Sequence, residues 1–371
     1  MKRGIRELAL LAAVLCLSGC GHAALPPETT VEQTAEAVME TRDYVEPTQP
    51  PETAPAETVP QEERFLLTFV GDCTLGANPT NYYAGVGFIK TVGEDYGYPF
   101  RNVLSYFERD NATFANLEGA LTDKGNPADK THTFRGPADY SRILTQNSVD
   151  VVTLANNHSM DYGKTGYDST LAALDGAEIP YVERDSSRLV TLEGGLKVGL
   201  YGMVYYAFDL EDMKAEIAAL RQQGAELVIV APHWGTEGTY QPTQQQIQVG
   251  HAAIDAGADI VWGSHPHVLQ PIEEYNGGVI FYSMGNFCFG GNGNPDDLDT
   301  ALLQQEVIRT PDGRVSLGTL RIVPCSVGSE PGKNNFQPTP MAVGTEEYNR
   351  ALSKLEGTFQ GPNLKIHKNG K

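Results

Sequence analysis

Length, composition and charge exclude several classes of protein before any motif is considered. The chain has 371 residues, enough for one large domain or two of ordinary size. Its formal net charge of −20 argues against a nucleic-acid partner, because phosphate backbones are bound by Lys and Arg. Hydrophobic residues make up 40% of the chain, a modest fraction that the polar N-terminal region helps to explain.

Residues 1–19 have the layout of a secretory signal peptide. A basic start, MKRGIR, precedes an apolar run over 8–17 that is too short to span a bilayer of about 30 Å as a helix. The run leads into Leu-Ser-Gly-Cys, which resembles a bacterial lipoprotein signal with Cys20 as the lipidated residue. This predicts a chain anchored through acyl groups to the extracytoplasmic face of a bacterial cell membrane. An ordinary secretory signal with an incidental cysteine is the alternative.

Residues 20–63 are rich in Pro, Glu and Thr and contain few residues that could form a core. Such a composition predicts a disordered, self-repelling linker that holds a folded domain away from the membrane. A frayed domain edge is the alternative. Beyond Cys20, the remaining cysteines are Cys73, Cys288 and Cys325, and their spacing predicts no disulfide framework, although one bridge stays open.

A folded domain is predicted over 64–328, followed by a C-terminal extension over 329–371 with a helix near 345–358. Strands rich in β-branched residues are predicted at 65–70, 112–116, 149–154, 179–182, 197–203, 226–231, 258–262 and 279–283. Helices are predicted at 99–109, 138–147, 165–176, 210–223 and 241–256, the last capped by Thr243. This alternation predicts an α/β fold with helices on the sheet faces. The stretches 300–310 and 314–327 have no helix between them, which predicts an antiparallel pair that completes a second sheet.

Side chains that can bind metals follow six of the apolar strands. They are Asp72; Asn116 and Glu118; Asn157, His158 and Asp161; His233 and Glu237; His265 and His267; and Asn286. The chain has eight histidines, and half of them stand at these strand ends. Because ligands bind at the carboxyl ends of strands in open α/β sheets, we expect these side chains to converge.

The chemistry of this set predicts a metal centre. Imidazole, carboxylate and amide oxygen together suit Zn, Mn or Fe. Two such ions about 3.5–4 Å apart can activate water and stabilise the leaving oxygen of a phosphoester. In the segment GSHPHVLQ, Pro266 restricts the backbone between His265 and His267. We therefore expect the two imidazoles to diverge towards different ions.

The motifs GD, NLEG, NNHSMDYG, HWGTE, GSHPHVLQ and SMGNF, in this order, resemble the CapA capsule-synthesis family, named for poly-γ-glutamate capsule. That family is similar to calcineurin-like metallophosphoesterases. The resemblance implies a four-layer αββα sandwich with two mixed sheets flanked by helices. It also implies a role in the synthesis, export or attachment of an envelope polymer such as poly-γ-glutamate, together with membrane capsule-synthesis proteins.

The resemblance also implies a role for each matching residue. Asp72 and His267 match ligands of a first metal, and Glu118 stands where phosphoesterases carry a bridging aspartate. Asn157, His233 and His265 match ligands of a second metal. His158 matches the catalytic histidine, a general acid to the leaving group, and Asp161 would orient it.

One motif departs from the phosphoesterase pattern. Those enzymes read Asp-x-His where this chain reads Asp72-Cys73-Thr74, so the first metal loses an imidazole. Cys73 is expected to point away from the site if the strand continues. A site with a single ion, or a weak first site, therefore stays open.

Four further residues are candidates for substrate binding: Asn116, Arg135, Glu237 and Asn286. Arg135 could clamp a carboxylate or phosphate, or pair with a surface acid, and Asn286 could simply form a turn. The ligand candidates also have plainer alternatives, such as a turn cap for Asp72 and a core position for His158. The leading interpretation is a metal-dependent hydrolase. A polymer-binding or partner-binding module with a vestigial metal site is the alternative, and a solute-binding lipoprotein ranks last.

Overall fold

The computed structural model describes residues 61–204 and 209–365 of the chain. The predicted signal peptide, Cys20 and the linker up to residue 60 lie outside these residues and stay predictions. Among the described residues, no helix combines the length and the apolar composition needed to cross a membrane.

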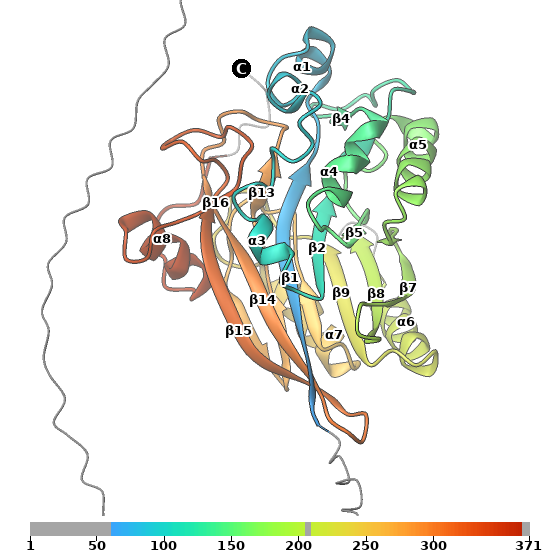
Figure 1. The fold of residues 1–371 in the computed structure, drawn as a ribbon. Helices are drawn as coiled ribbons and strands as arrows, with labels where there is room; N and C mark the ends of the chain where they lie inside the picture. The colour runs from blue at the N-terminus through green and yellow to red at the C-terminus, as the bar shows by residue number, and fades with distance from the viewer. Residues whose placement is uncertain (1–60, 205–208, 366–371) are drawn as a thin grey trace, which may run out of the picture. The chain divides into compact units, whose positions relative to one another are not determined.

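Two mixed β-sheets form the centre of the fold (Figure 1). The first has eight strands in the order β16-β15-β14-β1-β2-β5-β6, with β13 paired to β1, and the second has six in the order β11-β12-β10-β9-β8-β7. The strands of the first sheet are β1 (Glu63–Thr74), β2 (Ala112–Leu117), β5 (Val151–Thr153), β6 (Tyr181–Val182), β13 (Asn286–Phe289), β14 (Asp299–Arg309), β15 (Val315–Ser326) and β16 (Thr339–Pro340). Those of the second are β7 (Ser186–Thr191), β8 (Lys197–Val204), β9 (Leu227–His233), β10 (Ile260–Trp262), β11 (Ile272–Tyr275) and β12 (Gly278–Phe281). A small third sheet pairs β3 (Ala120–Leu121) with β4 (Arg135–Gly136).

The main core lies between the two large sheets. Alternate residues of a strand point to opposite faces, so Phe65, Leu67 and Phe69 of β1 face the second sheet while Val70 faces the other way. The pairing register of β1 shifts between Phe69 and Asp72, and beyond this irregularity Cys73 lies on the same outer side as Val70. The inner residues pack against Leu200, Ile229, Ile260 and Phe281 of the second sheet, among others. Phe69 stacks on Phe114 with ring centroids 5.0 Å apart.

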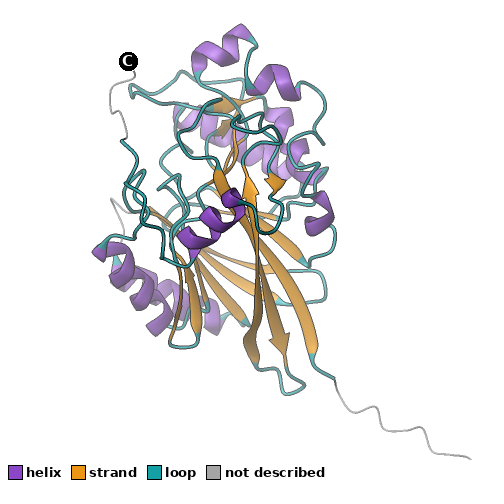
Figure 2. Ribbon diagram, turned by 90° about the vertical axis from the view of Figure 1, so that its left-hand side faces the viewer, coloured by secondary structure: helices purple, strands orange, loops and turns teal. Residues whose placement is uncertain are grey.

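Helices cover the outer face of each sheet, as Figure 2 shows from the side. On the first sheet lie α2 (Phe88–Val92), α3 (Leu104–Phe107), η1 (Ala138–Tyr140), α4 (Ser141–Thr145) and α5 (Gly163–Gly176). Helix α1 (Pro79–Ala84) lies beside β4 of the small sheet instead. On the second lie α6 (Leu210–Gln222) and α7 (Gln244–Asp255). The predicted layers of helix, sheet, sheet and helix are therefore confirmed. The predicted cap of α7 is also confirmed, since Thr243 and Gln246 form a capping box.

The C-terminal part corrects one prediction. β14 and β15 are antiparallel, as expected, but β14 pairs with β1, so the two strands extend the first sheet rather than completing a second one. Helix α8 (Glu346–Leu355) packs through Ala351 and Leu355 on the core beside these strands. β16 pairs with β15, so the C-terminal extension is built into the same sheet.

Two helix predictions were too long. Only α3 forms within 99–109, and the stretch 138–147 splits into η1 and α4. The short elements α1, α2, β7, β11 and β13 were not predicted, because strands and helices this short carry almost no periodic signal.

Candidate metal centre

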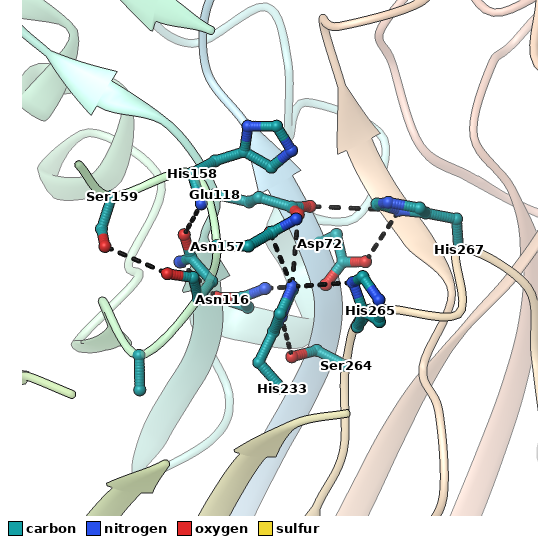
Figure 3. A network of polar contacts seen from close by, with 12 residues as sticks. Asp72, Asn116, Glu118, Asn157, His158, Ser159, His233, Ser264, His265 and His267 are labelled. Atoms are coloured by element: carbon teal, nitrogen blue, oxygen red, sulfur yellow. Dashed lines mark hydrogen bonds and ion pairs between the residues drawn. The ribbon is translucent and has the colours of Figure 1, made fainter. Parts of the chain in front are cut away.

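The strand ends named from the sequence meet at one place (Figure 3). β1, β2 and β5 are parallel neighbours in the first sheet, and β8, β9 and β10 are parallel in the second. Their carboxyl ends carry Asp72, Glu118, Asn157, His233, His265 and His267, which form one network of contacts. The predicted convergence is confirmed.

One group of ligand atoms surrounds the His233 imidazole. His233 Nε2 lies 2.9 Å from Asn157 Oδ1 and 3.1 Å from His265 Nδ1. It also lies 3.5 Å from Glu118 Oε1. Ser264 Oγ contacts the other ring nitrogen of His233 at 2.8 Å and so fixes the orientation of the ring. The resemblance assigned Asn157, His233 and His265 to a second metal and Glu118 to the bridging position between the two metals.

A second group surrounds His267. His267 Nδ1 lies 3.1 Å from Asp72 Oδ2 and 4.0 Å from Glu118 Oε2. Asn286 Oδ1 approaches the same nitrogen at 2.9 Å. Glu118 therefore directs one carboxylate oxygen at each group, as a bridging ligand would.

The loop His265-Pro266-His267 explains how two histidines so close in sequence serve two groups. His265 has φ 97° and His267 φ 57°, backbone angles that L-residues seldom adopt. The two ring centroids lie 6.0 Å apart. The hydrogen bond from Gly238 N–H to the Pro266 carbonyl, 2.8 Å long, ties this loop to the loop after β9. His265 thus contacts His233 of one group and His267 contacts Asp72 of the other, and their assignment to different ions stays a prediction.

The polar atoms of this centre fit a divalent cation. Glu118 is fully buried, and neither of its carboxylate oxygens has a hydrogen-bond partner among the described residues. Burial raises the pKa of Glu118 well above its ordinary value, and the nearby Asp72 adds to the effect. An unpaired buried carboxylate is costly unless it binds a cation. Burial also holds the pKa of His233 well below its ordinary value, which keeps the ring in the neutral form that binds metals.

His158 and Asp161 form a hydrogen-bonded pair beside the two groups. His158 Nδ1 lies 2.8 Å from Asp161 Oδ2, which also accepts the Phe134 N–H at 2.6 Å. Burial lowers the pKa of His158, although the hydrogen bond to Asp161 acts in the opposite direction. The predicted orienting contact between Asp161 and His158 is therefore present.

Lys130 contacts the His158–Asp161 pair, and it was not identified from the sequence. Its ammonium contacts Asp161 Oδ1 and donates to the Asn157 carbonyl oxygen at 2.8 Å. No sequence signal distinguishes Lys130 from other lysines, because it lies in a polar loop without periodicity. Its positive charge offsets the negative charge of the Asp161 carboxylate.

Asn116 has a supporting role rather than the predicted role in substrate binding. It is fully buried, and its Nδ2 donates to Asp72 Oδ1 at 2.8 Å. Asn156 Nδ2 donates to Asn116 Oδ1 at 3.0 Å, and Asn156 Oδ1 accepts the His158 N–H at 3.0 Å. The side-chain amides of Asn116 and Asn156 thus form connected hydrogen bonds that hold Asp72 and His158 in position.

A cavity of about 380 Å³ opens onto the centre. Its walls include His158, Glu237, His267 and Asn286, so two of the predicted substrate-binding residues line it. Glu237 is half-buried, and one of its carboxylate oxygens lies within 4.8 Å of ring nitrogens of His265 and His267.

Arg135 lies elsewhere, against the prediction that it clamps substrate. Its guanidinium packs on the rings of Tyr82, Tyr83 and Tyr162, at 4.3, 5.3 and 4.7 Å from their centroids. Arg135 is buried and is not among the residues that line the cavity. Its neighbour Phe134 faces the centre instead, 4.6 Å from the His158 ring.

Known proteins share this arrangement of motifs. The sequence model of the family described as "Bacterial capsule synthesis protein PGA_cap" matches residues 66–291. The chain belongs to this family. The matched region runs from β1 to β13 and therefore contains every residue of the two ligand groups. The resemblance inferred from the motifs is confirmed.

Two relatives are similar over most of the folded part. The "Capsule biosynthesis protein CapA" of Bacillus anthracis is 31% identical over 279 residues, 66% of this chain and 64% of that protein. The "PGA biosynthesis protein CapA" of Bacillus subtilis (strain 168) is 31% identical over 287 residues, 70% of this chain and 72% of that protein. The chain thus spans slightly less than two thirds of the Bacillus anthracis relative.

Solved structures give weaker similarities. The NAD nucleotidase of Haemophilus influenzae has a TM-score of 0.42 at 13% identity, over 80% of this chain and 63% of that one. A putative 5′-nucleotidase of Staphylococcus aureus has a TM-score of 0.44 at 15% identity, over 80% of this chain and 58% of that one. Both TM-scores are below 0.5, so the description of the fold rests on the strand order and helices given above.

Proposed function

We propose that this protein is a membrane-anchored, metal-dependent hydrolase that acts on an envelope polymer, such as poly-γ-glutamate, during capsule synthesis, export or attachment. The single observation that supports hydrolysis most is the buried Glu118 carboxylate, which directs one unpartnered oxygen at each of two ligand groups. The named relatives support the capsule context. Membrane capsule-synthesis proteins are the proposed partners.

The proposed cofactor is one or two divalent cations, with Mn, Fe and Zn favoured by the donor atoms. Asp72, Glu118 and His267 would hold one ion, and Glu118, Asn157, His233 and His265 the other. A cation bound there supplies a Lewis acid and activates water for attack.

His158 is the proposed general acid. Its Nδ1–H donates to Asp161, so the exchangeable site on the neutral ring is Nε2. A proton carried on Nε2 passes to the leaving group, and the low pKa of the buried ring favours that transfer. Lys130 contacts Asp161 and so helps to hold its carboxylate beside His158.

The test uses the purified full-length chain with added Mn²⁺, an activated phosphodiester and poly-γ-glutamate. We expect metal-dependent cleavage of at least one substrate, abolished in His265→Ala and slowed by about 10²–10⁴-fold in His158→Ala. The matched control is His251→Ala, because His251 stacks on Tyr275 in the α7 region, with ring centroids 3.7 Å apart, and contacts no ligand candidate. If the metal-loaded chain cleaves neither substrate but captures poly-γ-glutamate in the presence of chelator, the binding-module alternative replaces the hydrolase.

The anchor is tested separately. Radiolabelled fatty acid should be incorporated into the wild-type chain in bacterial cells and not into Cys20→Ser. The wild-type chain should sediment with membranes, with its folded part accessible to protease from outside the cytoplasm. Release of both forms into the medium in equal amounts would contradict lipid anchoring.

A further inference from the structure

The first ligand group lacks the imidazole that phosphoesterases carry two residues after the aspartate. Thr74 stands at that position. Cys73 cannot replace the missing ligand, because its thiol is buried on the opposite face of β1 and packs in the outer core with Cys288. What completes the group must therefore come from another element.

β13 brings Asn286 to this position. β13 lies parallel to β1, and Asn286 is the Cα partner of Asp72. The two strands can approach because Gly71 has no side chain, since a Cβ there would lie 2.0 Å from the Gly285 carbonyl oxygen. The resulting contact is a hydrogen bond of 2.9 Å from Asp72 N–H to that carbonyl. The backbone thus fixes Asn286 beside the aspartate.

The orientation of the Asn286 amide is also fixed. Its Nδ2 donates to the His267 carbonyl oxygen at 3.3 Å, so its Oδ1 is the atom that faces the His267 ring. Asn286 is 4% exposed, so water does not compete freely for this oxygen. The amide oxygen is therefore held towards the first ligand group rather than towards solvent.

Too many acceptors converge on one nitrogen for hydrogen bonding alone to explain the group. Asp72 Oδ2 and Asn286 Oδ1 lie 3.1 and 2.9 Å from His267 Nδ1, which can donate only one hydrogen. Asp72 Oδ2 and both Glu118 oxygens are buried without a hydrogen-bond partner among the described residues. A cation bound in this group would take Asp72 Oδ2, Asn286 Oδ1 and Glu118 Oε2 as ligands, and Glu118 Oε1 would remain for the second group.

The second group provides an internal comparison. There Asn157 Oδ1 lies 2.9 Å from His233 Nε2, the same distance that separates Asn286 Oδ1 from His267 Nδ1. Each group thus combines an amide oxygen, an imidazole nitrogen and one oxygen of Glu118. The groups differ in their fourth member, which is His265 in one and Asp72 in the other.

We propose that Asn286 is a ligand of the first cation and takes the place of the missing imidazole. This inference rests on the proposed metal centre. It makes the first donor set three oxygens and one nitrogen, whereas the second set has two oxygens and two nitrogens. Oxygen-rich sets favour Mn²⁺ and Mg²⁺, and imidazole-rich sets favour Zn²⁺ and Fe²⁺. The first position is therefore the more selective for Mn²⁺ over Zn²⁺.

Two neighbouring residues are the competing ligands. The Thr74 hydroxyl is buried without a hydrogen-bond partner among the described residues, but a neutral hydroxyl is a weaker donor than an amide oxygen. The Glu237 carboxylate groups with His265 and His267, and not with Asp72 and Glu118. Variants of both residues belong in the test.

The experiment counts bound Mn²⁺ on the chelator-stripped full-length chain by electron paramagnetic resonance and equilibrium dialysis. The wild type is expected to bind two ions, and Asn286→Ala one, or a second at least about tenfold more weakly. Asn286→Asp restores an oxygen donor and should bind two. Thr74→Val and Glu237→Gln should also bind two. The matched control is Asn334→Ala, which removes a buried amide that donates to the Phe289 and Asn292 carbonyls and accepts the Phe336 N–H, and that belongs to neither ligand group.

The outcomes separate the two proposals. A wild type that binds no ion overturns the metal centre itself. If the wild type and Asn286→Ala both bind two ions with equal affinities, only the role of Asn286 is overturned. The same holds if Thr74→Val or Glu237→Gln, and not Asn286→Ala, loses one ion. If Asn286→Ala does not fold by circular dichroism, Asn286→Asp decides, because its added charge should tighten the weaker Mn²⁺ site at least about tenfold. An unchanged affinity there overturns the proposal.

Discussion

The buried charges beside α8 and those at the strand ends have opposite chemistry. In the first, Lys354 on α8 donates to Asp297 and Asp299 at 2.6 and 2.7 Å, and Arg350 forms two hydrogen bonds with Asp299 at 2.7 and 2.8 Å. Two carboxylates face two cations, and both side chains of the Lys354–Asp299 pair are almost fully buried. In the second, Asp72 and Glu118 face imidazoles and amides, and no Lys or Arg of the described part of the chain forms an ion pair with them.

The difference separates a structural role from a functional one. A paired buried cluster satisfies its own charges and needs nothing from outside. The cluster at the strand ends has three carboxylate oxygens without a hydrogen-bond partner within residues 61–204 and 209–365, and a bound cation would satisfy them. Burial alone would not distinguish the two sites, whereas the pairing of each oxygen does.

The largest effect is expected from breaking the paired cluster. Lys354→Met removes the cation that bridges Asp297 and Asp299, and leaves buried charge uncompensated. We expect the free energy of unfolding to fall by about 3–5 kcal/mol, measured by urea denaturation at pH 7. A loss below about 1 kcal/mol would mean that solvent reaches the cluster and that the comparison is wrong.

At the strand ends we expect a substitution to raise the free energy of unfolding rather than lower it. Glu118→Gln replaces an unpaired buried carboxylate by a neutral amide of similar shape. In the presence of chelator, we expect this variant to be more stable than the wild type by about 1–3 kcal/mol, and to gain no stability from added Mn²⁺.

The matched control makes the same change of acid to amide in the paired cluster. Asp299→Asn should lower the free energy of unfolding, because it removes the partner of Arg350 and Lys354. If both amide variants destabilise the metal-free chain equally, Glu118 is stabilised by the protein itself and needs no cation.

Much of this centre was accessible from the sequence, for a physical reason. Parallel strands place their carboxyl ends together, so residues after apolar strands converge even when they are far apart in the chain. This reasoning places Asp72, Glu118, Asn157 and His233 correctly.

Other features depend on long-range pairing that no local pattern encodes. The pairing of β14 with β1 joins residues more than 230 positions apart, such as Phe69 and Leu303. Lys130 was missed for this reason, and Asn286 was identified as a candidate but its position beside Asp72 was not predicted. The positive φ of His265 could not be predicted from the sequence either, because Asn and Gly, not His, are the residues that usually adopt a positive φ.

A pH titration of stability contrasts a paired acid with an unpaired one. Burial raises the pKa of Asp299, but the hydrogen bonds and charges of Arg350 and Lys354 outweigh it and hold that pKa below its ordinary value. Burial raises the pKa of Asp110 to about 7, with Thr68 and Thr113 acting in the opposite direction. The two acids therefore give opposite slopes.

The direction in which stability changes with pH depends on whether the folded or the unfolded state binds the proton more tightly. Asp299 stabilises the fold at pH above about 4, and this contribution is lost as pH falls through its lowered pKa. The folded state holds the Asp110 proton more tightly than the unfolded state, so stability falls as pH rises from about 4 to about 7. Unfolding curves from pH 3 to 8 should show that Asp110→Asn removes the loss near pH 7 and that Asp299→Asn removes the loss at acid pH. Unchanged slopes in both variants would contradict these assignments.

The smallest change in the free energy of unfolding is expected when a surface lysine, rather than the buried Lys354, is replaced by methionine. Lys164 contacts Asp168 one turn along α5 at 2.6 Å, but its side chain is 81% exposed, against 2% for Lys354. Such pairs contribute about 0.3–0.5 kcal/mol. Lys164 also lies in the first turn of α5, where the helix dipole disfavours a cation, which offsets part of that gain. Lys164→Met should therefore change the free energy of unfolding by less than about 0.5 kcal/mol. A loss as large as that of Lys354→Met would show that the substitution, and not the burial of the pair, causes the effect.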